Sequence, residues 1–129
     1  MNSTGSQDEA WEERRRVLGE RYMSRVADDI AENGDEFQEY LTSVVWSRWA
    51  RTGLATRDRS LVVLAMTAAL GRLEEFALHV TTASRAGVTD AEIDELLMQI
   101  TAYCGAPAGV SARRVVLAIR SDINSHPRR

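Results

Sequence analysis

The sequence has few of the residues on which several classes of protein depend. Cys104 is the only cysteine among 129 residues, so the chain cannot form an internal disulfide, a CxxC redox pair or a cysteine-rich zinc site. The longest apolar run, Leu61–Leu70, is shorter than the roughly 20 residues that a membrane-spanning helix needs. The first residues do not have the basic start and apolar stretch of a secretory signal. We therefore expect a cytoplasmic protein with no membrane segment.

An excess of positive charge is also missing. Sixteen basic and nineteen acidic residues give a net charge of -3, and the two signs are interspersed along the chain. The concentrated basic surface of a nucleic-acid-binding protein is therefore not expected. Hydrophobic residues make up 44% of the chain, which is enough for one core. We expect a single domain over residues 8–124, with flexible tails at 1–7 and 125–129.

Apolar residues recur every three to four positions through most of the chain, and no useful length alternates with a period of two. This pattern predicts an all-α fold of five to six helices. The expected helices cover residues 8–31 (with Gly19 as a point of interruption), 36–50, 56–86, 90–104 and 106–123. On the second helix, the residues expected to face inward are Phe37, Tyr40, Leu41, Val44, Val45, Trp46 and Trp49.

Local signals mark several helix ends. Thr89 and Glu92 have the spacing of a capping box, in which each side chain bonds the other's backbone N–H. Pro107 is acceptable in the first turn of the last helix. Gly71 lies inside the third predicted helix, where it favours either a close helix crossing or a kink.

Polar residues follow Gly71 where an apolar helix would be expected to continue. Arg72, Glu75 and His79 lie at i, i+3 and i+7, so a continuous helix would present them on one face. This face extends the apolar stripe of the preceding turns, which suggests that the three side chains point inward, where unpaired charge is costly. A cation, a carboxylate and an imidazole could then hold an anion and move a proton. The simpler alternative is a solvated face with a weak Arg72–Glu75 ion pair.

The remaining candidates are less specific. Glu74, Glu75 and His79 could in principle hold a metal, but no second carboxylate–histidine set is apparent on another helix, so we expect no metal. Cys104 is more consistent with a small buried residue than with a nucleophile. Tyr103 can either pack or donate a hydrogen bond to a ligand. Trp46 and Trp49 are consistent with a core, a subunit contact or a pocket wall.

Four segments resemble the γ-carboxymuconolactone decarboxylase family. They are TRDRSL (56–61), GRLEEFALHV (71–80), AGVTDAEIDELLMQ (86–99) and YCGAPA (103–108). The similarity extends from about Arg14 to Ile119. It implies an all-helical protomer in a ring-like homo-oligomer, a hexamer or a trimer, with active sites partly formed at subunit contacts.

The resemblance also implies a cofactor-independent carboxy-lyase that acts on an anionic lactone, γ-carboxymuconolactone being the specific hypothesis. His79 matches the family's histidine and would be the proton donor or oxyanion partner, with Glu75 orienting or recharging it. Arg72 would bind a substrate carboxylate. Other residues that we expect to contact substrate are Glu74, Tyr103, Trp46 and Trp49. Peroxidase-type relatives carry a CxxC pair where this chain has Arg72 and Glu75, so their redox chemistry is not available.

Some positions depart from the decarboxylase pattern. Leu73 stands where a third acidic residue is common, Val110 stands near a usual asparagine, and the segment VWSRWARTGL (45–54) is one residue shorter and lacks a glycine and a proline. These differences concern the substrate more than the fold. Two alternatives therefore stay open. One is a paralogue that performs proton transfer, isomerisation or another tailoring step on a bulkier substrate, and the other is a non-enzymatic helical binding module.

Overall fold

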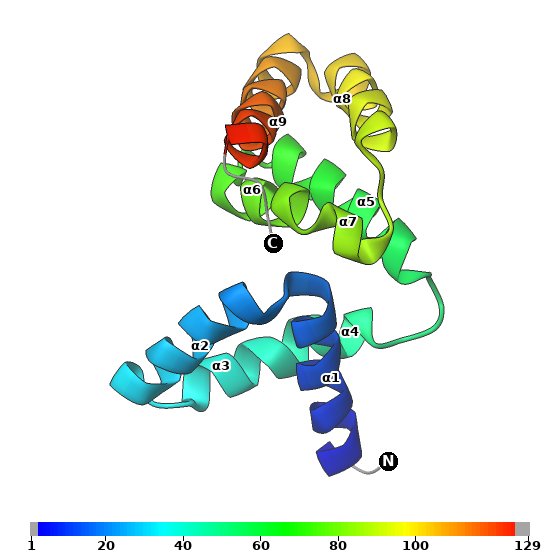
Figure 1. Cartoon of the computed structure of the whole chain (residues 1–129). Helices are drawn as coiled ribbons and strands as arrows, with labels where there is room; N and C mark the ends of the chain where they lie inside the picture. Colours follow the sequence, from blue (N-terminus) through cyan, green and yellow to red (C-terminus); the bar gives the residue numbers. More distant parts are fainter. Residues whose placement is uncertain (1–2, 126–129) are drawn as a thin grey trace. The chain divides into compact units, whose positions relative to one another are not determined.

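The computed structural model describes the backbone of residues 3–125 and the side chains of residues 7–125. All regular structure in this part of the chain is helical (Figure 1). The elements are α1 (Ser3–Leu18), α2 (Glu20–Asn33), α3 (Glu36–Leu41), η1 (Thr42–Trp46), α4 (Ser47–Trp49), α5 (Thr56–Ala69), α6 (Leu73–Thr81), α7 (Ala83–Ala86), α8 (Asp90–Cys104) and α9 (Ala106–Ser125). The all-α prediction is confirmed, but the helices are more numerous than the five to six expected, because Gly19, Gly71, a π-helical turn and a break at Thr82 divide the longer ones. The first helix begins at Ser3 rather than near Asp8.

The chain forms two compact units, residues 1–56 and residues 57–129. In unit 1, α1 packs against η1, α4 and α2. Its most buried apolar side chains include Val17, Met23, Trp46 and Trp49. A polar network also runs through this unit, from Arg14 on α1 to Gln38 and Thr42.

Unit 2 contains the larger apolar core. α8 and α9 form a helical hairpin, and α6 packs on α9 (Figure 1). The core side chains come from α5 to α9 and from the α7–α8 loop: Leu64, Ala68, Phe76, Val80, Ala83, Val88, Ile93, Leu97, Ile100, Ala112 and Val116. Burying these side chains supplies the main free-energy gain on folding.

The inward face predicted for residues 36–50 is partly wrong. Phe37 and Tyr40 are each 66% exposed, and Val44 is also exposed. The buried line along α3 and η1 instead runs through Gln38, Thr42 and Trp46. Apolar periodicity selected the wrong face because two polar side chains occupy the inner positions, where they bond Arg14.

Gly71 ends α5 rather than crossing another helix. It has a φ of +72°, in the left-handed region that glycine tolerates best. The N–H of Arg72 bonds the carbonyl of Thr67, and the N–H of Gly71 bonds that of Ala68. These two bonds make a Schellman cap, which satisfies the last carbonyls of α5. A new helix, α6, then starts at Leu73.

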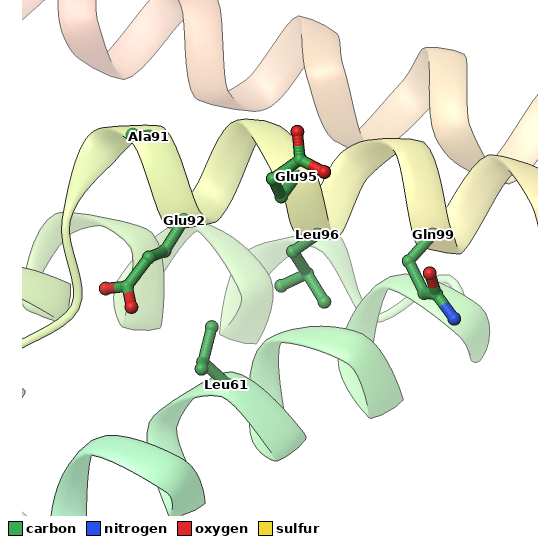
Figure 2. A pocket seen from close by; sticks show the side chains of 6 residues that line it. All are labelled: Leu61, Ala91, Glu92, Glu95, Leu96 and Gln99. Atoms are coloured by element: carbon green, nitrogen blue, oxygen red, sulfur yellow. The ribbon is translucent and has the colours of Figure 1, made fainter.

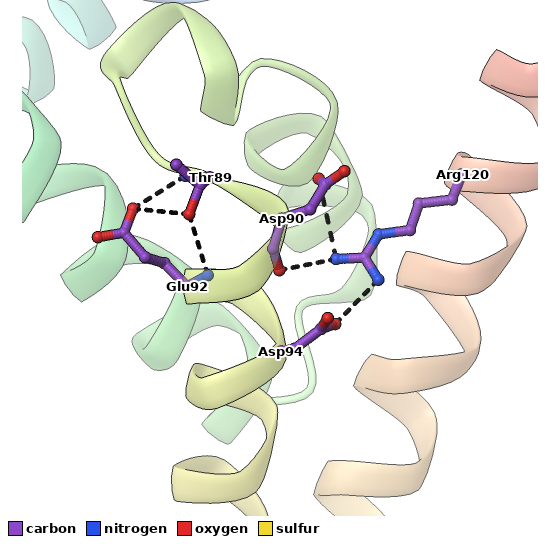
Figure 3. Close-up of polar contacts among 5 residues, drawn as sticks. All are labelled: Thr89, Asp90, Glu92, Asp94 and Arg120. Atoms are coloured by element: carbon purple, nitrogen blue, oxygen red, sulfur yellow. Dashed lines mark hydrogen bonds and ion pairs between the residues drawn. The ribbon is translucent and has the colours of Figure 1, made fainter.

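The start of α8 follows the predicted capping box closely (Figure 3). The Glu92 N–H donates to Thr89 Oγ1 at 3.1 Å, and the Thr89 N–H donates to Glu92 Oε1 at 2.9 Å. Arg57 at the start of α5 forms an ion pair with the same Glu92 side chain. Arg120 on α9 donates to Asp94 Oδ1 at 2.9 Å and to the Asp90 carbonyl at 3.0 Å. These bonds fix the first turn of α8 against α9.

The α8–α9 hairpin depends on close backbone approach at Gly109. A Cβ atom built on this buried glycine would lie 2.8 Å from Thr101 Cβ and 3.1 Å from Thr101 Cα. Real Cβ contacts of this length require the neighbour to move, and the Thr101 backbone belongs to a packed helix. Position 109 therefore has room only for glycine.

We expect Gly109→Ala to lower the free energy of unfolding by about 1–3 kcal/mol, because the added methyl group overpacks the hairpin. Gly53→Ala is a matched control, since a Cβ at Gly53 meets no atom within 4 Å. The control should change stability by less than about 0.5 kcal/mol. Urea unfolding followed by circular dichroism measures both variants. Equal stability of the two would contradict the proposed packing.

Candidate functional site

The charged residues after Gly71 lie at the start of α6, on its exposed end. Arg72 is the N-cap residue, with non-helical backbone angles, and Glu74 and Glu75 lie in the first turn. All three side chains are exposed. Carboxylates in this position are favoured by the partial positive charge of a helix N-terminus. The expectation that Arg72 and Glu75 point into the core is therefore wrong, because the helix was expected to continue through Gly71 and instead restarts there.

His79 occupies the other end of α6, in its last turn. Its side chain is buried, with 8% of the residue exposed, beside the core residues Phe76 and Val80 on the same helix. Burial lowers the pKa of the His79 imidazole from 6.5 to about 4. The imidazole is therefore neutral at pH 7, able to donate one hydrogen bond and to accept another.

The simple ion-pair alternative for this face is also not observed. Among the residues with described side chains, Arg72 and Glu75 form no ion pair with each other or with another residue. Glu75 lies one helical turn before His79, but no hydrogen bond joins the two side chains. The arrangement is an exposed cation and carboxylates at the helix start, with a buried neutral base one turn further along.

The other predicted substrate-binding residues occupy different environments. Trp46 and Trp49 belong to unit 1, where their rings stack with centroids 5.0 Å apart. Both are almost fully buried, so they serve the packing of that unit. Tyr103, at the end of α8, is 83% exposed. Cys104 is exposed as well, which corrects the expectation of a small buried residue.

Unit 2 contains a groove of about 460 Å³ between α5 and α8 (Figure 2). Leu61 and Leu96 form its apolar part, and its other lining residues are Ala91, Glu92, Glu95 and Gln99. None of the predicted site residues lines this groove. Glu92 is paired with Arg57, but Glu95 leaves a negative charge that repels an anionic substrate, so we do not assign the decarboxylation site to this groove.

The described residues do not offer an evident metal site. No group of three histidine, cysteine, aspartate or glutamate side chains comes together in this part of the chain. No helix in it is long and apolar enough to cross a membrane.

Arg14 is a buried charged residue that the apolar pattern did not predict. Arg14 lies in a run of three arginines. The structure buries it in unit 1. The sequence signal for its burial was its position, three residues after Trp11 and three before the apolar Val17, which places it on the inner stripe of α1.

Comparison with known proteins gives consistent matches. Residues 35–118 match the model of the carboxymuconolactone decarboxylase family. The chain is 31% identical over 128 residues to the 4-carboxymuconolactone decarboxylase of Acinetobacter baylyi, covering 98% of this chain and 96% of that protein. It is also 31% identical over 117 residues to the nitrosuccinic acid decarboxylase npaB of Metarhizium robertsii, covering 90% of this chain and 82% of that protein.

The buried imidazole predicts a pH dependence of stability. Because the folded-state pKa of His79 is lowered to about 4, its contribution is fully present above pH 6.5 and is lost as the pH falls toward 4. The loss amounts to about 3 kcal/mol, since one pKa unit corresponds to about 1.4 kcal/mol. Urea unfolding of the wild type and of His79→Gln, measured at intervals from pH 7 to pH 4, isolates this contribution. Identical slopes for the two proteins would contradict the neutral buried state.

Proposed function

We propose that this chain, which belongs to the carboxymuconolactone decarboxylase family and is a carboxy-lyase of that family, decarboxylates a γ-carboxy lactone in the cytoplasm without a cofactor. The specific substrate proposed is γ-carboxymuconolactone. The observation that carries this proposal is the match over nearly the full length of both chains to a 4-carboxymuconolactone decarboxylase. The distribution of charge along α6 supports it.

The reaction needs little from the protein beyond positioning and electrostatics. When carbon dioxide leaves, the conjugated lactone carbonyl takes up the remaining electron pair and becomes a furan-like dienolate. A proton is then added at carbon. The protein must hold the carboxylate groups, stabilise the oxyanion and supply the proton.

We assign these tasks to residues of α6 and its N-cap. Arg72 is exposed and forms no ion pair with the described residues, so its guanidinium is available for a substrate carboxylate. Neutral His79 donates an N–H hydrogen bond to the developing oxyanion. The negative charge that forms beside the imidazole raises its pKa, so His79 takes up a proton from solvent and, as imidazolium, passes that proton to carbon, which returns the ring to its neutral form. Glu75, one turn away, relays the proton from solvent to His79.

Homo-oligomer formation is part of the same proposal. Three apolar side chains on α5 and directly after its last residue are 45% exposed or more, namely Val62, Met66 and Leu70. They lie at i, i+4 and i+8, on a stripe opposite to core residues Leu64 and Ala68. A helix that is apolar on both faces is normally buried on both. Assembly into a hexamer or trimer would cover this stripe. Light scattering of the purified protein measures the oligomeric state.

The relative from Metarhizium robertsii supports a second candidate substrate. Its identity to this chain equals that of the lactone decarboxylase, although its name describes an open-chain nitro acid. In nitrosuccinic acid the nitro group can accept the electron pair that decarboxylation leaves. The same Arg72, Glu75 and His79 roles apply to such an acid. Assays with both acids, following carbon dioxide release, separate the two candidates.

We expect His79→Ala to lower kcat on the preferred acid by on the order of 10²-fold, since both oxyanion stabilisation and proton transfer depend on the imidazole. Glu75→Gln should lower kcat by at least about tenfold, while Glu95→Gln, an exposed glutamate of the same unit, should not change it. Product formation is measured by absorbance, and folding by circular dichroism.

Full activity in a folded His79→Ala protein would remove His79 from the mechanism. Failure of the wild type to release carbon dioxide from either acid would contradict both substrate proposals. An equal effect of the Glu75 and Glu95 substitutions would show that general surface charge, rather than the residue one turn before His79, is responsible.

A further inference from the structure

Unit 1 contains a buried cation that the proposed reaction does not use. Arg14 on α1 is only 1% exposed, which makes it one of the most buried large side chains of the described chain. Burying a guanidinium is costly unless its charge and its five N–H donors are compensated. The contacts around Arg14 show which of these donors are compensated.

Two neutral side chains occupy one corner of the guanidinium. Nη1 donates to Gln38 Oε1 at 2.9 Å and to Thr42 Oγ1 at 3.0 Å. Nε is buried and has no hydrogen-bond acceptor. Within the part of the chain whose side chains are described, Nη2 donates to no acceptor either, and no carboxylate lies within ion-pair distance of Arg14. The Nε–Nη2 edge of the guanidinium therefore has no hydrogen-bond acceptor among the described residues.

The nearest linked carboxylate lies beyond an intervening amide. Gln38 accepts from Arg14 through its oxygen and donates to Asp29 Oδ2 through its nitrogen, at 2.8 Å. Asp29 is further satisfied by Asn33, which donates at 2.9 Å. The amide orients toward the cation, but it does not place a negative charge on the Nε–Nη2 edge.

Two aromatic rings complete the surroundings of the cation. The guanidinium carbon lies 5.6 Å from the ring centroid of Trp11 and 5.8 Å from that of Tyr22, at cation–π distances. Both aromatic residues are only half-buried, so each reaches the surface of unit 1. Because Arg14 itself is only 1% exposed, a ligand reaches the Nε–Nη2 edge only if a neighbouring side chain moves aside.

The arrangement of the N–H donors on the Nε–Nη2 edge determines which kind of ligand fits it. Nε and Nη2 present two parallel N–H donors, a geometry that matches the two oxygens of a carboxylate. We propose that Arg14 is a binding site for a small carboxylate anion, held by this edge between Trp11 and Tyr22. The site lies wholly within unit 1, whereas Arg72, Glu75 and His79 all lie in unit 2. It does not rest on the proposed reaction.

Nuclear magnetic resonance tests this site directly in the full chain. The Nε–Hε signal of Arg14 is assigned in the ¹⁵N-labelled wild type through its own side-chain correlations, so no variant is needed for the first test. Succinate is added at constant ionic strength, with sodium chloride in a parallel titration. We expect a saturable shift of the Arg14 signal with succinate and not with chloride. An unchanged Arg14 signal at saturating succinate would overturn the proposal.

Three variants separate this site from the proposed reaction site and from other anion sites. In Arg72→Gln, which lacks the guanidinium proposed to hold the substrate carboxylate, the thermal unfolding midpoint should still rise with succinate. Adding Arg14→Lys, which keeps the charge but not the two-donor edge, should abolish this rise. Adding Arg25→Lys, at an exposed arginine of unit 1, is the matched control and should keep it. If the rise persists after Arg14→Lys, or is absent in Arg72→Gln, succinate binds elsewhere and the proposal is wrong.

Discussion

Gly71 is the backbone constraint on which the candidate site depends. Its positive φ closes the Schellman cap of α5 and allows α6 to begin two residues later. Without this turn, one continuous helix would carry Arg72, Glu75 and His79 on a single inward face. With it, the charged residues stand in solvent at the start of α6, where the helix dipole favours the carboxylates, and the imidazole lies at the buried end.

The separation of the exposed charged residues from the buried imidazole matches what the proposed decarboxylation requires of the protein. An exposed guanidinium can capture a dissolved carboxylate, while a neutral imidazole in an apolar environment interacts strongly with the charge that develops as carbon dioxide leaves. Burial of His79 beside Phe76 and Val80 costs little as long as the ring is uncharged. The apolar core that fixes α6 through α9 therefore also sets the protonation state of the proposed catalytic group.

Sequence reasoning succeeded where local signals determine structure. The all-α class, the Thr89–Glu92 capping box and the start of α9 beside Pro107 depend on short-range bonds and periodicity, and all are confirmed. It failed where a long-range polar contact reversed the apolar pattern, as on α3, where Gln38 and Thr42 point inward to meet Arg14. Gly71 was recognised as unusual, but periodicity alone cannot distinguish a kink from a helix end. Only the structure shows that the helix ends at Gly71, and this ending is what separates Arg72 and Glu75 from the core.

The protonation state of His79 tests the central claim most directly. An NMR titration of the ¹⁵N-labelled imidazole from pH 8 to pH 4, in the folded protein without substrate, reports it at the single residue. A ring buried as the structure shows should stay neutral to well below pH 6 and titrate with a pKa of about 4. A midpoint near 6.5, the value of a solvated histidine, would show that the imidazole is open to water and would contradict the account of a buried neutral base on α6.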